Sequence, residues 1–161
     1  MSMTEIDALI ARHGDLFYLL TFLFAALEGE IFVIFAGFAV QRGHLNMNEL
    51  IIAAWLGSLT GDQICFWLGR HFGNHVFYYF PQKKAAIEKA VGRLEKYAIV
   101  FIMSYRFMYG VRNVSGIAIG LSRLPWQKFA FWNVIAALVW AIFFSYFGYF
   151  FGDFVGDWLA K

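Results

Sequence analysis

The sequence predicts an all-α integral membrane protein in which two opposed re-entrant helical hairpins alternate with spanning helices as an inverted repeat. Of its 161 residues 61% are apolar and only 15% are charged, and the mean hydropathy is +0.60. A globule of this size cannot bury so much apolar surface away from water, so lipid must be its solvent. Charged residues inside the apolar segments predict the hairpins.

Composition also bears on the class of function. A net charge of +2 without a basic stripe gives no reason to expect a nucleic-acid partner. The single cysteine, Cys65, allows no intramolecular disulfide, and the four histidines do not combine into a metal site. We therefore expect no metal and no cofactor. The first fifteen residues lack the basic region of a cleaved signal peptide, so the first apolar segment is expected to remain.

That first segment, Leu16 to Val40, is split by Glu28-Gly29-Glu30. Its arms of about 12 and 10 residues each reach roughly 15 to 18 Å, about half of the ~30 Å hydrocarbon core. Non-helical backbone at that depth needs protein or a water-filled cavity around it, so the charged triplet favours a re-entrant hairpin. One continuous helix with both glutamates facing a bundle is the alternative.

The spanning helix predicted next is Leu50 to Leu68, which carries Asp62. Gly57 and Gly61 form a G-x-x-x-G pair that permits close helix approach. Together, residues 16–68 are expected to form the first hairpin and its spanning helix.

The polar stretch Arg70 to Lys96 holds six basic and two acidic residues, so the positive-inside rule places it in the cytoplasm. Apolar residues recur at three-to-four spacing from Gln82 onward, which predicts an amphipathic helix on the anionic inner leaflet. A merely solvated connector is the alternative.

Residues 98–151 are expected to form the second hairpin and spanning helix. The apolar segment Ala98 to Leu121 is interrupted by polar residues and glycines, so an uninterrupted helix is not expected there. The interrupting residues are Arg106, Gly110, Arg112, Asn113, Gly116 and Gly120. Phe129 to Phe151 follows, with Asn133 as its one strongly polar member, and is the clearest spanning helix.

The chain thus repeats a broken segment followed by a spanning helix, within one predicted membrane domain, residues 1–161. If the stretch 70–96 is cytoplasmic, the broken segments enter from opposite faces, as in secondary transporters with a site near the midplane. A multi-pass protein that can form a homo-oligomer is expected.

Five ionisable residues at membrane depth cost about 2.5 to 3.5 kcal/mol each on insertion scales. They are Glu28, Glu30, Asp62, Arg106 and Arg112. Ion pairs that only hold the bundle together are one interpretation, but such pairs are seldom more stabilising than apolar packing. A cavity is the better interpretation, in which arginine binds phosphate in a bidentate way and a desolvated carboxylate exchanges protons.

The motifs in these segments resemble the DedA family, also called the VTT or SNARE-associated family. The run FWLGRHFG, from Phe66 to Gly73, follows G-x-x-x-G-D, and the stretch Tyr105 to Trp140 contains the paired arginines. The resemblance covers about Glu28 to Gly152.

The resemblance implies two facing re-entrant hairpins and a protein that moves undecaprenyl phosphate or phospholipid between leaflets, dependent on the proton motive force. It places the essential acids on Glu28 or Glu30 and on Asp62, the aromatic-x-x-x-basic signature on Phe66 and Arg70, and the essential arginines on Arg106 and Arg112.

We therefore expect a lipid translocase of the bacterial inner membrane that binds membrane lipids by an anionic head group. The expected phosphate ligands are Arg106, Arg112 and Arg70. The expected proton-coupling or gating acids are Glu28, Glu30 and Asp62. The expected motif and hinge positions are Phe66, Gly57, Gly61, Gly110 and Gly116. A proton-coupled transporter of a small solute and a non-transporting scaffold are the alternatives. An enzyme is not expected, because only Asn113 and Ser115 offer a nucleophile or base beside the arginines.

Overall fold

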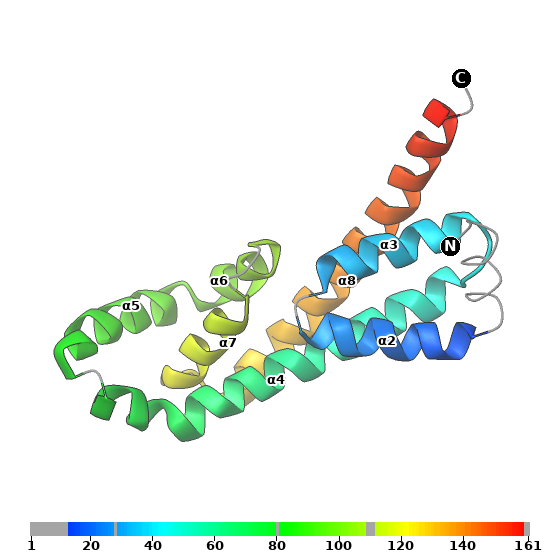
Figure 1. The fold of residues 1–161 in the computed structure, drawn as a ribbon. Helices are drawn as coiled ribbons and strands as arrows, with labels where there is room; N and C mark the ends of the chain where they lie inside the picture. The colour runs from blue at the N-terminus through cyan, green and yellow to red at the C-terminus, as the bar shows by residue number, and fades with distance from the viewer. Residues whose placement is uncertain (1–12, 28, 80, 109–111, 160–161) are drawn as a thin grey trace. The chain divides into compact units, whose positions relative to one another are not determined.

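The computed structural model describes residues 13–27, 29–79, 81–108 and 112–159, and no strand occurs among them. The prediction of an all-α fold is confirmed. In chain order (Figure 1) the elements are α2 (Gly14–Ala26), α3 (Glu30–Gln41), α4 (Met47–Tyr79), the 3₁₀ turn η1 (Pro81–Lys83), α5 (Lys84–Lys96), α6 (Ala98–Ser104), the 3₁₀ turn η2 (Tyr105–Phe107), α7 (Arg112–Leu121) and α8 (Trp126–Leu159).

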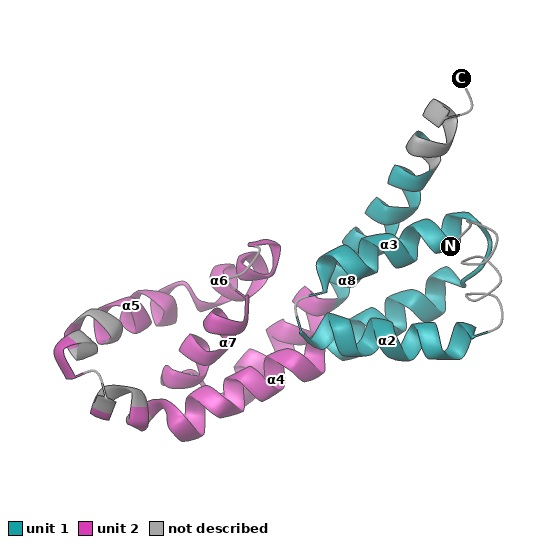
Figure 2. Cartoon of the chain, in the orientation of Figure 1, with its two compact units in different colours: residues 1–58, 138–161 teal, residues 59–137 magenta. Residues whose placement is uncertain are grey.

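The helices divide into two compact units (Figure 2). Unit 1 comprises Met1–Ser58 with Leu138–Lys161, and unit 2 comprises Leu59–Ala137. The long helices α4 and α8 each contribute one part to each unit. The single membrane domain predicted from the sequence stays a prediction.

Unit 1 contains a helical hairpin made of α2 and α3, which contact each other along their length. The ring of Phe32 on α3 stacks on two rings of α2, at 5.3 Å from Phe17 and 4.7 Å from Phe24. A Cβ on Gly29 would lie 2.6 Å from the carbonyl oxygen of Phe24, so the tight turn requires glycine. The alternative of one continuous helix over Leu16 to Val40 is wrong, because the chain breaks where the charged triplet stands.

Glycines also bring α3 against α8 in unit 1. A Cβ on Gly37 would collide with the carbonyl oxygen of Ser145, and a Cβ on Gly148 would collide with that of Ile34. Gly57 on α4 meets the backbone of Phe22 in the same way, as its G-x-x-x-G pattern predicted. Backbones in contact at these points let Val33 and Trp140 pack into a fully buried core.

In unit 2 the segment Ala98 to Leu121 is broken into α6, η2 and α7, so the predicted interruption is confirmed. Helix α7 packs on α4 through a second reciprocal glycine pair: a Cβ on Gly69 would collide with the carbonyl oxygen of Ile117, and one on Gly120 with that of Phe66. Phe66 also stacks on Phe129 of α8 at 4.7 Å between ring centroids. This contact anchors the fully buried core of the unit.

Helix α4 continues past the predicted end at Leu68 and stops at Tyr79. The stretch 70–96 therefore begins as helix, which corrects the predicted boundary between spanning helix and connector. No proline interrupts the chain before Pro81, and proline disfavours helix in the residue that precedes it. The predicted helix in the connector forms as α5, and its place on a membrane leaflet stays a prediction.

Among the residues that the structure describes, two helices are long and apolar enough to span a membrane, over Met47–Gly73 and Trp126–Gly152. Only 33% of the more apolar span, which lies on α8, is buried inside the protein. Large apolar side chains therefore cover its outer surface, among them Phe131, Phe143, Phe147, Phe150 and Phe154. Such a surface is suited to lipid rather than to water.

We expect Gly120→Ala to destabilise the protein by about 1 to 3 kcal/mol, because the added methyl group must push α7 away from the Phe66 carbonyl. Unfolding in detergent, followed by tryptophan fluorescence, measures the change. Gly92→Ala on α5 is the matched control: its Cβ meets nothing within 4 Å, so the better helix propensity of alanine should raise stability by up to about 1 kcal/mol. Equal stabilities of the two variants would contradict the proposed contact.

Candidate functional site

A cluster of polar side chains is buried in unit 2, where four elements meet. Arg106 is 0% exposed, Arg112 is 1% exposed and Asp62 is 2% exposed. Asn133 and Tyr105 are buried beside them. Asp62 comes from α4, Arg106 and Tyr105 from η2, Arg112 from α7 and Asn133 from α8.

Asp62 joins both arms of the second broken segment to α4. Its Oδ2 accepts a hydrogen bond from Nη2 of Arg106, and its Oδ1 accepts one at 3.0 Å from Nε of Arg112. Each carboxylate oxygen thus serves one guanidinium group. Because the two like charges are held in one buried place, the carboxylate between them offsets repulsion that water does not screen there. The structure therefore brings together three of the predicted site residues.

Asn133 provides a second hydrogen-bond acceptor for Arg106. Its Oδ1 accepts a hydrogen bond from Nη2 of Arg106 at 2.6 Å and one from the hydroxyl of Tyr105 at 3.5 Å. Its Nδ2 has no hydrogen-bond partner among the described residues. Asn133 and Tyr105 are not among the site residues predicted from the sequence. The available signal was that Asn133 is the one strongly polar residue in an otherwise apolar helix, because such a group needs a buried partner.

Arg112 occupies the first position of α7, where the helix dipole disfavours a cation. Asp62 supplies a negative charge at this helix end and offsets that cost. Gly116, one turn further along, lets the two helices approach: a Cβ there would lie 2.8 Å from Cβ of Cys65 on α4. Gly116 therefore belongs to the contact that places Arg112 beside Asp62, and its predicted role as a motif or hinge position stays a prediction.

The hydrogen bonds that Arg70 makes are to residues outside this cluster. Its Nε donates to the carbonyl of Gly120 at 2.8 Å and its Nη2 to that of Leu124 at 2.7 Å, while its guanidinium lies 4.9 Å from the ring centre of Phe66. The first bond satisfies a carbonyl that the end of α7 leaves without a helical partner, and the second holds the segment that links α7 to α8. They give Arg70 and Phe66 a structural role, and the phosphate contact expected for Arg70 stays a prediction.

The other predicted residues belong to different parts of the chain. Glu30 is 7% exposed at the start of α3 in unit 1, a helix end that favours an acidic side chain. Glu28 and Gly110 lie outside the described residues. The prediction that all five ionisable residues share one cavity therefore stays a prediction. In the part of the chain that the structure describes, no group of three His, Cys, Asp or Glu side chains is placed to hold a metal.

Sequence comparison finds relatives of this chain that are named as membrane proteins. The family model of the VTT domain matches residues 27–150. Inner membrane protein YohD of Escherichia coli is 30% identical over 88% of the chain and 72% of its own length. Undecaprenyl phosphate transporter A of Bacillus subtilis is 29% identical over 74% of the chain and 63% of its length, and protein DedA of E. coli is 28% identical over 86% and 70%. No solved structure matches significantly.

Replacement of the bridging carboxylate of Asp62 should lower the free energy of unfolding of unit 2. We expect Asp62→Ala to cost about 3 to 5 kcal/mol, because it leaves two buried guanidinium groups without their shared anion. Glu49→Ala, an exposed acid in the first turn of the same helix that interacts with Tyr18, should cost no more than about 1 kcal/mol. Unfolding of both variants in detergent measures the difference, and similar values for the two would contradict the assignment of Asp62 as the bridge.

Asn133→Ala should lower stability by about 1 to 3 kcal/mol, because Arg106 and Tyr105 lose a common buried acceptor. Asn48→Ala, at an exposed position, is the control and should be close to neutral. The same unfolding measurement applies. A neutral Asn133→Ala variant would show that the amide does not hold the arginine.

Proposed function

The chain belongs to the VTT-domain family, known also as the DedA family, and on that premise we propose that it moves an anionic lipid between the leaflets of the bacterial inner membrane. One relative is named as an inner membrane protein and another as a transporter, which supports a membrane transporter rather than an enzyme. The observation that carries the proposal is the buried pair Arg106 and Arg112, which converge on one carboxylate.

The two arginines are suited to a phosphate group. A guanidinium stays protonated even when buried, and its planar fork donates two parallel hydrogen bonds to phosphate oxygens. The carboxylate of Asp62 now takes donors from both arginines, so a phosphate that binds them must displace it or share them with it. The substrate class that this chemistry favours is a lipid phosphate, carried by undecaprenyl phosphate or a phospholipid.

Competition between the carboxylate and phosphate also offers a way to couple transport to protons. When Asp62 takes up a proton it loses its charge and holds the arginines less strongly, so phosphate binds them more readily. Thermodynamic linkage makes the effect reciprocal: bound phosphate favours proton uptake by Asp62. Proton and lipid phosphate then bind together and leave together, and a proton gradient can drive the lipid.

An inverted repeat of two re-entrant hairpins is part of the proposal, and the packing within each unit supports it. In each unit the second arm of the broken segment meets the later part of a long helix through a reciprocal pair of glycines, each set against a carbonyl three residues before the partner glycine. The matched positions are Ile34 and Gly37 with Ser145 and Gly148, and Ile117 and Gly120 with Phe66 and Gly69. Inverted repeats in transporters place a substrate site near the midplane.

The chemistry is unequal between the repeats. When the long helices are aligned on Gly69 and Gly148, Asp62 corresponds to Ala141 and Asn133 corresponds to Ala54, and both alanines are fully buried. Unit 1 has retained the packing and lacks these two polar groups. The phosphate site is therefore assigned to unit 2.

Reconstitution into liposomes tests the proposal, with movement of polyprenyl phosphate and of phospholipid measured with and without a proton gradient. Arg106→Lys and Arg112→Lys should each slow movement roughly tenfold or more, because lysine keeps the charge and loses the fork. Arg42→Lys, an exposed position in unit 1, should leave the rate unchanged.

The alternatives predict other results. If neither lipid moves under either condition, the proposed function fails. Uptake of a small solute that depends on pH and survives Arg112→Lys would favour a solute transporter. Intact cellular function after simultaneous apolar replacement of the five ionisable residues would favour a non-transporting scaffold.

A further inference from the structure

An apolar groove of about 470 Å³ lies in unit 2, outside the polar cluster. It is lined by residues of α5, α6 and α7, the helices so labelled in Figure 1. Its volume falls in the range of roughly 300 to 1,000 Å³ that is typical of small-molecule pockets. The lining residues are Ala90, Val91, Arg93, Leu94, Tyr97, Phe101, Val114, Ser115, Ala118 and Leu121. Apart from Arg93, the ring hydroxyl of Tyr97 and the hydroxyl of Ser115, these side chains are hydrocarbon.

The groove and the phosphate site share helix α7. Ser115 lines the groove and lies three residues after Arg112, so the two side chains are neighbours on one face of the helix. Val114, also in the lining, is 65% exposed, so the groove opens to the surface of the unit. One turn of α7 thus separates an open hydrocarbon-lined groove from the buried arginine.

Two basic residues of α5 lie at or next to the lining of the groove. Arg93 is exposed and lines it, and Lys96, one turn further, lies with its Nζ 5.5 Å from the ring centre of Tyr97. Neither acid of α5, Glu88 or Glu95, lines the groove, and Oε1 of Glu95 accepts the backbone N–H of Arg123 at 2.5 Å. The groove therefore combines an apolar interior with a cationic rim.

We propose that this groove binds the hydrocarbon chain of an anionic lipid, with the negatively charged head group at the rim formed by Arg93. The proposal rests on the proposed function in taking a lipid as the ligand. An apolar interior beside exposed cations matches an amphiphile with a negative head group, and basic residues near a membrane surface attract such lipids. A chain held in the groove keeps the lipid beside α7, the helix that carries Arg112.

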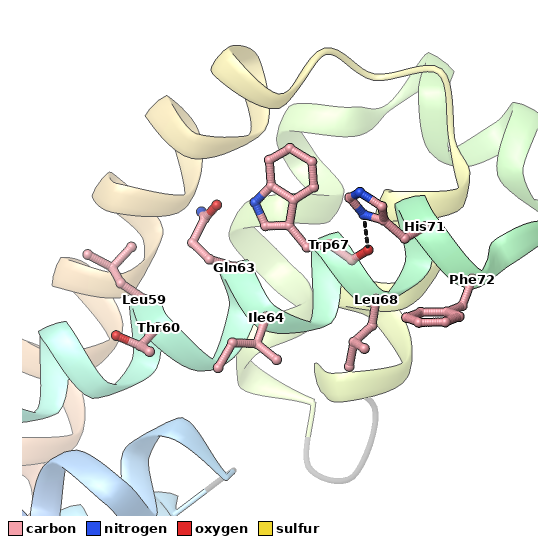
Figure 3. A pocket seen from close by; sticks show the side chains of 8 residues that line it. All are labelled: Leu59, Thr60, Gln63, Ile64, Trp67, Leu68, His71 and Phe72. Atoms are coloured by element: carbon pink, nitrogen blue, oxygen red, sulfur yellow. Dashed lines mark hydrogen bonds between the residues drawn. The ribbon is translucent and has the colours of Figure 1, made fainter.

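A second groove illustrates why the rim matters. It has a volume of about 650 Å³ and runs along one face of α4 (Figure 3). Its lining is Leu59, Thr60, Gln63, Ile64, Trp67, Leu68, His71 and Phe72. No lysine, arginine, aspartate or glutamate lines it, so no charge indicates which molecule would cover it, and we assign it no ligand.

Photocrosslinking in phosphatidylcholine vesicles tests the inference. The probes are phosphatidylglycerol and phosphatidylcholine with the same photoreactive acyl chain, and adducts are mapped by mass spectrometry. We expect the anionic probe to label residues 90–121 in preference to the zwitterionic one. Arg93→Gln should reduce that preference roughly fivefold, the size expected of one basic residue near anionic lipid. Lys89→Gln removes the same charge from α5 outside the lining and should leave the preference unchanged.

A variant that fills the groove gives a second measurement. Ala118→Phe should reduce labelling of residues 90–121 by both probes, because the ring occupies the space of the chain. Equal labelling by the two probes, together with no effect of Arg93→Gln, would overturn the inference and indicate contact with bulk lipid only. Arg93 is exposed, so its variant keeps the fold even if the filled groove does not.

Lipid movement measured in the same vesicles separates the two proposals. Arg112→Lys should slow movement and leave groove labelling intact. Normal movement without preferential labelling overturns the groove and leaves the proposed function standing. Preferential labelling without movement of any lipid supports the groove and overturns the proposed function.

Discussion

The contact of Asp62 with two arginines is the interaction on which unit 2 depends. Arg106 lies in η2 and Arg112 begins α7, and both donate hydrogen bonds to one carboxylate of α4. Without that carboxylate, two buried cations would face each other where water screens them poorly. The same contact fixes the broken segment on α4 and holds the guanidinium groups in place. A ligand that competes for the arginines therefore acts directly on the packing of the unit.

Close backbone contact makes this ion-pair geometry possible. In lipid the hydrophobic effect does not drive helices together, so association depends on van der Waals packing and on polar contacts between helices. Gly69, Gly116 and Gly120 allow α7 to lie directly on α4, and the short distance between the backbones lets Arg112 reach Asp62. Arg70 secures the far end of α7 through the carbonyls that it binds. Small residues and charges thus stabilise the same interface.

The division of chemistry within unit 2 suits a ligand with two unlike parts. The buried arginines offer hydrogen bonds to a phosphate, and the groove beside α5 offers an apolar surface to a chain. Both sites include residues of α7, so a movement of that helix would act on both parts of one lipid. Unit 1 contains the same kind of glycine packing, with alanines at the positions that the proposed repeat matches to Asp62 and Asn133, so the two units are alike in packing and unequal in chemistry.

The helical class and the two breaks could be predicted from the amino-acid sequence alone, because the cost of placing charge or irregular backbone in lipid is a local property of each segment. The family followed from the sequence motifs. The sequence also singled out Asp62, Arg106 and Arg112. Only the tertiary structure decided their partners: Asp62 and Arg106 are 44 residues apart, and Asn133 reaches Arg106 from another helix. It also turned Arg70 toward the carbonyls at the end of α7 and extended α4 to Tyr79. Such contacts depend on which distant helix faces supply partners, and segment composition does not encode that arrangement.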